Sequence, residues 1–289
     1  MNYAFFTGCN IPARVPQYEK SARAVLGLLG VGLVDMENFA CCGYPARNLD
    51  RKAFLLSAAH NLALAEKSGL EMLVLCKCGF GTFKEAQHQL SAEPAMLEEI
   101  NGLLADSGLR YNGNTRVNHF LSVLYHHVGV EGVKARISRS YKDLPVAVHY
   151  GCHALRPSAL TGFDDPVNPV VFDRLVEATG ATSAQWPEKL DCCGAPLMGV
   201  NDELSMELTR RKLNASRKSG AAFICTSCPF CQIQFDHVQE RIESLSRSGH
   251  VMAPILYSQL LGLAMGLGEE DVGLDENRLD ITGIKAYLT

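Results

Sequence analysis

The stretch Ala40-Cys41-Cys42-Gly43-Tyr44-Pro45 is the most informative in this chain, because its Cys-Cys-Gly centre occurs again as Cys192-Cys193-Gly194. A single cysteine precedes each Cys-Cys-Gly, and a close pair of cysteines follows it. The first set therefore comprises Cys9, Cys41, Cys42, Cys76 and Cys78, and the second comprises Cys152, Cys192, Cys193, Cys228 and Cys231. Two such sets account for ten of the eleven cysteines and predict two sites of the same kind.

The composition is that of a folded protein with an ordinary surface. Hydrophobic residues make up 47% of the 289 residues and charged residues 20%, which is enough to form a packed core. The net charge of -4 does not suggest a nucleic-acid partner, which would need a clustered basic surface. The longest apolar run, 255–267, is shorter than the ~20 residues that span a bilayer. We expect a cytoplasmic protein without a membrane span, in which cysteines indicate metal binding or redox chemistry rather than disulfides.

Short apolar segments alternate with longer segments of helical periodicity along the whole chain. The apolar segments predict strands at 3–6, 31–34, 72–75, 146–150, 182–185 and 222–224. The periodic segments predict helices at 15–29, 50–68, 82–90, 98–104, 120–128, 169–179, 202–219 and 255–263. Single cysteines and cysteine pairs come directly after predicted strands. This order predicts an α/β fold with parallel sheets, in which the sites lie at the carboxyl ends of the strands.

The spacing of the two cysteine sets indicates an internal duplication. Cys152 lies 143 residues after Cys9, Cys192 lies 151 residues after Cys41, and Cys228 lies 152 residues after Cys76. We therefore predict two related halves, residues 1–143 and residues 144–289, arranged about a pseudo-twofold axis that brings the two sites together.

The grouping of the cysteines favours iron–sulfur clusters. Cysteine thiolates hold such clusters, commonly four to each cluster. Two adjacent cysteines suit a cluster whose separate irons can each take one thiolate, and five thiolates exceed the needs of a cubane. Zinc is an alternative, and so are ordinary buried cysteines that pack as small apolar side chains. Cys225 belongs to neither set, and we expect it to be a buried residue.

The arrangement resembles the catalytic B subunit of heterodisulfide reductases over nearly the whole chain. The likeness includes Tyr3-Ala4-Phe5-Phe6, His149-Tyr150-Gly151-Cys152-His153, and Cys228-Pro229-Phe230-Cys231 with Gln234-Phe235-Asp236. It implies two noncubane [4Fe-4S] clusters that have five cysteine ligands each and face one another. The second cluster would use Cys152, Cys192, Cys193, Cys228 and Cys231, and the first would use Cys9, Cys41, Cys42 and Cys76.

The fifth ligand of the first cluster is where this sequence departs from the family pattern. The family has Cys-x-x-Cys, whereas this chain has Cys76-Lys77-Cys78-Gly79, so that Gly79 occupies the usual ligand position. We expect Cys78 to reach the cluster through a local change of the loop. If it does not, the first cluster has four cysteine ligands.

The resemblance also implies a reaction and partners. Each cluster would supply one electron to the cleavage of a small-molecule disulfide, or accept one in the reverse formation of a disulfide from thiols. His153 is the candidate proton donor, with an ordinary backbone-bonded histidine as the alternative, and Arg14, Arg47 and Arg156 are candidates for holding substrate anions. The expected partners are a ferredoxin-like C subunit and a flavin-containing A subunit of the same complex.

Two other functions stay open from the sequence. One is an electron-transfer or anchoring subunit of a larger oxidoreductase, such as a succinate or fumarate reductase, or a subunit of a sulfur-oxidising heterodisulfide-reductase-like complex. The other is a zinc-stabilised interaction protein.

Overall fold

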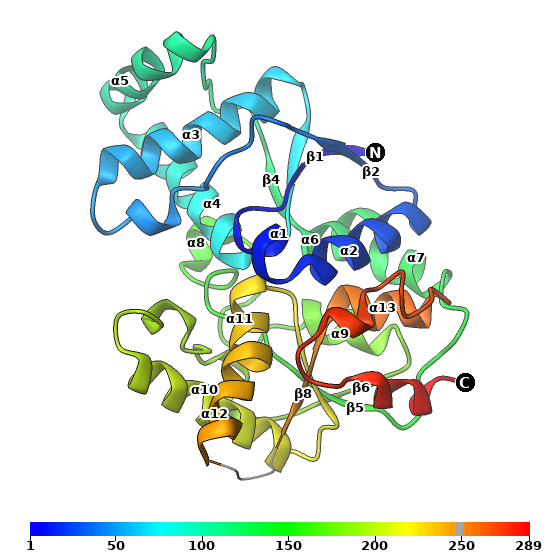
Figure 1. Cartoon of the computed structure of the whole chain (residues 1–289). Coiled ribbons are helices and arrows are strands. Elements are labelled where there is room, and N and C mark those ends of the chain that lie inside the picture. Colours follow the sequence, from blue (N-terminus) through cyan, green and yellow to red (C-terminus); the bar gives the residue numbers. More distant parts are fainter. Residues whose placement is uncertain (247–250) are drawn as a thin grey trace.

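The computed structural model describes residues 1–246 and 251–289, and it consists of two α/β halves that each contain a four-stranded parallel sheet (Figure 1). The first sheet has the order β2-β1-β3-β4 and the second has the order β6-β5-β7-β8. The identical order confirms the predicted fold class of two related parallel-sheet halves. The strands are β1 (Asn2–Phe6), β2 (Gly32–Asp35), β3 (Glu71–Val74), β4 (Val117–His119), β5 (Pro145–Val148), β6 (Thr182–Ala184), β7 (Phe223–Thr226) and β8 (Ala253–Leu256).

Helices connect the strands in both halves. Those of the first half are α1 (Asn10–Arg14), α2 (Pro16–Leu28), α3 (Arg51–Lys67), α4 (Lys77–Ala92), α5 (Pro94–Leu104), α6 (Phe120–Ser122), a π-helical segment (Val123–Gly129) and α7 (Val130–Lys134). Those of the second half are α8 (Ser158–Thr161), α9 (Val171–Glu177), α10 (Asp202–Lys218), α11 (Pro229–Ile233), a π-helical segment (Gln234–Val238), α12 (Gln239–Ser246) and α13 (Tyr257–Ala264). The predicted boundary between residues 143 and 144 lies between the two sheets in the sequence and stays a prediction.

Both sheets direct their carboxyl ends into the cysteine-bearing loops. In the first sheet, Phe6 of β1 pairs with Val74 of β3, so that the chain enters the loops before Cys9 and Cys76 at the same edge. In the second sheet, Val148 of β5 pairs with Cys225 of β7 in the same manner. Because all strands are parallel, the cysteines that follow them gather at one edge of each sheet.

The structure differs from the sequence prediction at several elements. It contains helices that the sequence did not predict, namely α1, α7, α8, α11 and α12. The segment predicted as a helix at 120–128 follows strand β4, and the one predicted at 255–263 begins inside strand β8, to which Ile255 and Leu256 belong; neither strand was predicted. A three- or four-residue strand joined directly to a helix is too short for its period to be recognised. Helix α4 starts at Lys77 rather than near residue 82, because Cys76 forms its N-terminal cap.

The two halves share a buried interface that joins the strand ends carrying Cys76 and Cys228. Helix α2 of the first half packs against α13 of the second, and α6 packs against α9. The buried hydroxyl of Tyr18 in α2 donates to the carbonyl oxygen of Leu75 (3.0 Å) and lies 2.7 Å from the hydroxyl of Ser227. One side chain therefore ties together the two residues that precede Cys76 and Cys228.

Within residues 1–246 and 251–289, every helix is too short or too polar to traverse a lipid bilayer.

Candidate functional site

The glycine of each Cys-Cys-Gly is required by a close approach of two backbones. Gly43 and Gly194 have φ of +90° and +94°, in the left-handed region that glycine tolerates best. A Cβ atom on Gly43 would lie 2.7 Å from the carbonyl oxygen of Phe54, and one on Gly194 would lie 2.5 Å from that of Ser205. Each Cys-Cys-Gly loop thus packs directly on the helix that follows it, α3 or α10, and this contact holds both cysteines in place.

The first cysteine of each adjacent pair is favoured as a thiolate. The N–H groups of Gly43 and Gly194 donate to the sulfur atoms of Cys41 (3.5 Å) and Cys192 (3.4 Å). Hydrogen bonding from Cys42 lowers the pKa of Cys41 to about 6, and hydrogen bonding from Cys152 and then Cys193 lowers the pKa of Cys192. Because the thiolate is the form of cysteine that binds metals, both loops present a sulfur suited to metal binding at the same position.

The cysteines after β3 and β7 cap the helices that follow. Cys76 is the N-cap of α4, and its sulfur accepts a hydrogen bond from the N–H of Gly79 (3.4 Å), while Cys228 is the N-cap of α11. The N–H of Gly79 favours negative charge on the Cys76 sulfur, but hydrogen bonding with Cys228 and burial raise the pKa of Cys76 well above its usual value.

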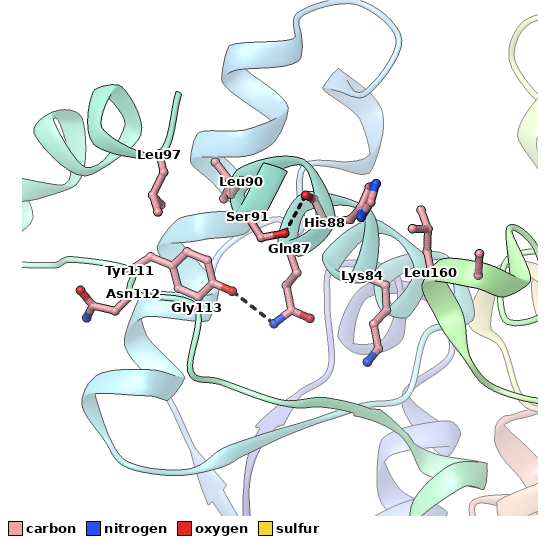
Figure 2. Close-up of a pocket in the computed structure, with 11 residues that line it drawn as sticks. Lys84, Gln87, His88, Leu90, Ser91, Leu97, Tyr111, Asn112, Gly113 and Leu160 are labelled. Carbon is pink, nitrogen blue, oxygen red and sulfur yellow. Dashed lines mark hydrogen bonds between the residues drawn. The ribbon is translucent and has the colours of Figure 1, made fainter. Parts of the chain in front are cut away.

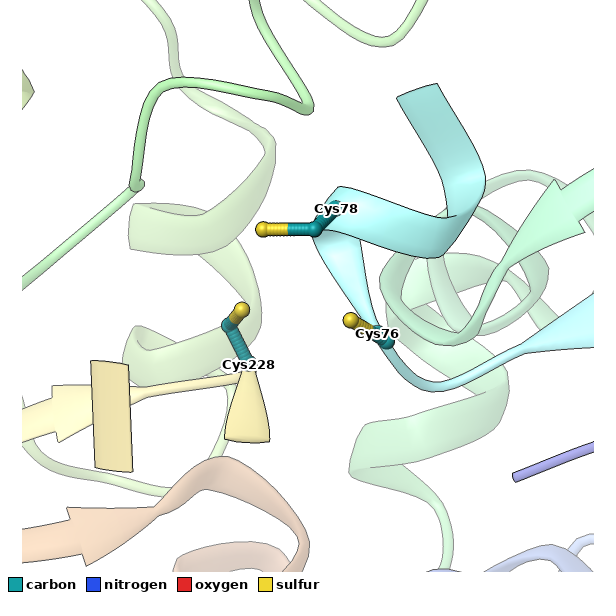
Figure 3. Close-up of side chains that lie close together, drawn as sticks. All are labelled: Cys76, Cys78 and Cys228. Carbon is teal, nitrogen blue, oxygen red and sulfur yellow. The ribbon is translucent and has the colours of Figure 1, made fainter. Parts of the chain in front are cut away.

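The two cysteine sets meet at the interface between the halves. The sulfur atoms of Cys76, Cys78 and Cys228 lie within 4.8 Å of one another, and all three residues are buried. Figure 3 shows that Cys76 and Cys78 come from the start of α4 and Cys228 from the start of α11, and that their sulfurs point into the same space. The thiols of the two halves therefore form one connected group.

Each set lines a cavity of its own. A cavity of about 90 Å³ is bordered by all five cysteines of the first set and closed by Phe230 of the second half. A narrower cavity of about 20 Å³ is bordered by all five cysteines of the second set, together with Lys77 and Cys78 of the first half. The structure therefore brings together both predicted sets, and Cys78 lies beside both cavities.

His153 lies between these cavities. Its Nδ1 is 2.9 Å from the sulfur of Cys78, and its ring packs edge-on against Tyr44, which in turn contacts Phe230. Burial lowers the pKa of His153, so that the neutral imidazole is favoured. The three rings form the wall of the space between the two sets.

The predicted arginines have partners of their own or are exposed, although Arg47 and Glu85 lie close enough to His153 to affect its pKa. Arg47 forms an ion pair with Glu85 (2.9 Å), Arg156 donates to the carbonyl oxygen of Pro166 (3.2 Å), and Arg14 is exposed. Cys225 is fully buried in β7 and is not among the described residues that border the two cavities, as expected for a packing residue.

Two residues of the site were not identified from the sequence. Lys77 is only 1% exposed, and its ammonium group donates to the carbonyl oxygens of Tyr150 (2.6 Å) and His149 (3.5 Å) in the other half. His149 Nε2 lies 3.3 Å from the sulfur of Cys231, and burial lowers the pKa of this histidine well below its usual value. Their positions in the motifs were visible in the sequence, but the contacts across the halves were not.

A larger hollow lies apart from the cysteines. It has a volume of about 460 Å³ and is formed by α4, the segment 111–113 and α8 (Figure 2). Gln87 in its wall already donates to the hydroxyl of Tyr111 (3.2 Å) and the carbonyl oxygen of Thr115 (2.7 Å). Its described lining residues include no cysteine.

The donor set at these cavities fits an iron–sulfur cluster. All eleven cysteines are free thiols, each cavity is bordered by the five cysteines of its own set, and backbone N–H groups point at three of the sulfurs. Thiolates with N–H···S hydrogen bonds are the usual surroundings of such clusters. Cys76, Cys78 and Cys228 with the adjacent His153 would also suit zinc, so the donor geometry alone leaves that alternative open.

Comparisons with known proteins match both halves of the chain. The sequence profile of the CCG family, described as a cysteine-rich domain, matches residues 3–80 and 146–236. The chain is 35% identical to the B subunit of the ferredoxin/F420H2-dependent CoB-CoM heterodisulfide reductase of Methanosarcina acetivorans, covering 96% of this chain and 93% of that protein. It is 34% identical to the 8-methylmenaquinol:fumarate reductase membrane anchor subunit of Wolinella succinogenes, covering 97% of this chain and 98% of that protein.

A solved structure supports the fold. The crystal structure of a hypothetical protein from Helicobacter pylori matches with a TM-score of 0.77 at 18% sequence identity. The match covers 98% of this chain but only 52% of that one, so the chain spans about half of the solved protein.

Proposed function

Because the chain belongs to the CCG family of cysteine-rich domain proteins, we propose that it is the disulfide-handling B subunit of a heterodisulfide-reductase-type complex. The B subunit of the ferredoxin:CoB-CoM heterodisulfide reductase of Methanosarcina mazei is 34% identical over 95% of the chain and supports this assignment. The observation that carries the proposal is the meeting of Cys76 and Cys78 with Cys228 across the two halves. A substrate disulfide between two such sites could be reached from both sides.

We propose two noncubane [4Fe-4S] clusters as the cofactors. The second set would hold one cluster, and Cys9, Cys41, Cys42 and Cys76 of the first set would hold the other. Cys78, the predicted fifth ligand of the first cluster, borders both cavities. The ligands of the second cluster would be Cys152, Cys192, Cys193, Cys228 and Cys231.

In this proposal the bound clusters would supply single electrons, whereas the protein would position the substrate disulfide and donate protons. Tyr44 and Phe230 contact one another across the two halves and both border the first cavity. His153, whose imidazole faces this space, is the proposed proton donor to a leaving thiolate. Because burial lowers its pKa, a protonated His153 would release its proton readily.

The proposed partners are a ferredoxin-like C subunit and a flavin-containing A subunit, in a cytoplasmic complex. Cys9 and Cys41 of the first set are exposed, whereas Cys193, Cys228 and Cys231 of the second set are buried. Electrons from a partner would therefore reach the first set more directly than the second.

Metal analysis of protein purified without oxygen tests the proposal. We expect about eight irons and about eight acid-labile sulfides in each chain, because two four-iron clusters would be bound. Protein reduced by a viologen dye should then cleave small-molecule disulfides. Stoichiometric zinc without sulfide would contradict the proposal and support the zinc-stabilised interaction protein.

The 34% identity to a fumarate reductase anchor subunit favours a second candidate function. As an electron-transfer or anchoring subunit, the chain would carry clusters without acting on a disulfide. The same experiment distinguishes the two functions. The electron-transfer or anchoring function would be favoured if the protein has its full iron content and is reversibly reduced by the dye, but no disulfide oxidises the reduced protein.

A further inference from the structure

We propose that Cys78 is not a ligand of the first cluster but a free thiol that the first half contributes to the space between the two sets. As a consequence, the first cluster would have four cysteine ligands and lack a protein thiolate on the side of Gly79. This inference rests on the function proposed above, and it concerns which thiols hold the first cluster.

The argument starts from the two helices that follow the strand ends. Cys76 and Cys228 are the N-caps of α4 and α11. The next three positions are Lys77-Cys78-Gly79 in the first half and Pro229-Phe230-Cys231 in the second. When positions are counted from the N-cap of each helix, Cys78 therefore corresponds to Phe230, and Gly79 corresponds to Cys231.

In the second half, these two positions point in different directions. Cys231, at the third position of α11, lies within 4.8 Å of Cys193 and His149 and thus faces its own set. Phe230, at the second position, borders both cavities and contacts Tyr44 of the first half. The second position of the helix therefore lies at the interface beside both cavities, and the third position serves the helix's own set.

Cys78 takes the corresponding place in the first half. It borders both cavities, and its sulfur contacts His153 at 2.9 Å and lies within 4.8 Å of Cys228. The sulfur is also within 4.8 Å of that of Cys76, so the Cys78 thiol lies where the two sets meet. Tight packing holds this arrangement, because a Cβ atom on Gly81 of α4 would lie 2.8 Å from the carbonyl oxygen of His153.

Gly79 marks the position where the first set lacks a thiol. A Cβ atom on Gly79 would be 3.6 Å from the Cβ of Cys76, 3.5 Å from Val74 and 3.7 Å from Phe6, all ordinary contacts. Gly79 and Phe6 both border the first cavity. A side chain at position 79 would therefore enter the first cavity without displacing backbone, as Cys231 does in the second half.

Iron analysis and electron paramagnetic resonance of single variants test this assignment. Cys9→Ser and Cys152→Ser serve as references that remove the signals of the first and second clusters. We expect Cys78→Ala to keep the wild-type iron content and the signal of the first cluster, whereas Gly79→Cys should alter that signal by adding a thiolate. Cys78→Ser provides a second variant, should the alanine variant fold poorly, and Cys225→Ala controls for the loss of a buried thiol.

Two results would overturn the inference. One is loss of about half of the iron from both Cys78→Ala and Cys78→Ser, together with the signal that Cys9→Ser removes, while Cys225→Ala keeps its iron. The other is an unchanged first-cluster signal in folded, iron-loaded Gly79→Cys. These outcomes are distinct from failure of the proposed function, which would appear as wild-type protein without iron, or as iron-loaded protein that does not react with disulfides.

Discussion

Replacing Gly194 by alanine tests whether the Cys-Cys-Gly loop depends on close packing against α10. The new Cβ would lie 2.5 Å from the carbonyl oxygen of Ser205 and 3.3 Å from the Cβ of Leu208, and the backbone would keep a φ of +94°. The left-handed conformation costs a non-glycine residue ~1–2 kcal/mol. Displacing a packed helix costs a further ~1–3 kcal/mol, as in other overpacked interiors. We therefore expect a loss of ~2–5 kcal/mol in the free energy of unfolding from the two effects together.

Gly199 provides the matched control, because it has a φ of +85° and nothing within 4 Å of an added Cβ. Gly199→Ala should lose only the backbone cost of ~1–2 kcal/mol. Urea unfolding followed by far-ultraviolet circular dichroism compares both variants with the wild-type protein, and iron content shows whether the loop of the proposed ligands Cys192 and Cys193 still supports metal binding. Equal losses of stability in Gly194→Ala and Gly199→Ala would refute the packing argument.

Three further predictions concern buried residues around the site. Tyr18→Phe removes the hydroxyl that joins Leu75 and Ser227, and urea unfolding should report a loss of ~1–3 kcal/mol; an unchanged midpoint would contradict this role. Cys225→Ala should keep full iron content and lose only about 1 kcal/mol of stability, whereas loss of iron would identify Cys225 as a ligand. Burial lowers the pKa of His119 in the native state to about 3. Below about pH 6.5 the unfolded chain therefore takes up a proton on this histidine, whereas the native state does not, and acid destabilises the fold. Between pH 7 and pH 5, the free energy of unfolding of the wild-type protein should therefore fall by ~2 kcal/mol more than that of His119→Gln. An equal fall in the two proteins would contradict the assignment of this effect to buried His119.

The element order was largely predictable, and its exceptions have separate physical reasons. The strands at 3–6, 72–75 and 146–150 are short apolar segments that lead into cysteine-bearing loops, and they correspond to β1, β3 and β5. β4 and β8 were missed because each is continuous with the helix after it, which leaves no turn residues to mark a boundary. The early start of α4 was missed because a cysteine serves as its cap, a role that sequence rules assign to serine, threonine, aspartate or asparagine.

The order of the cysteines along the chain was enough to define the two sets, since spacing and repetition are properties of the sequence alone. The need for glycine after each cysteine pair is likewise a local property of the backbone. The sequence did not reveal which groups approach these glycines, namely the carbonyl oxygens of Phe54 and Ser205. Only the tertiary structure decided what lies between the sets. Tyr18 and Ser227 are 209 residues apart, and Cys78 and His153 are 75 apart, so no local pattern could have paired them. The direction of Cys78 depends on how α4 packs against the other half, because neighbouring positions of a helix point about 100° apart.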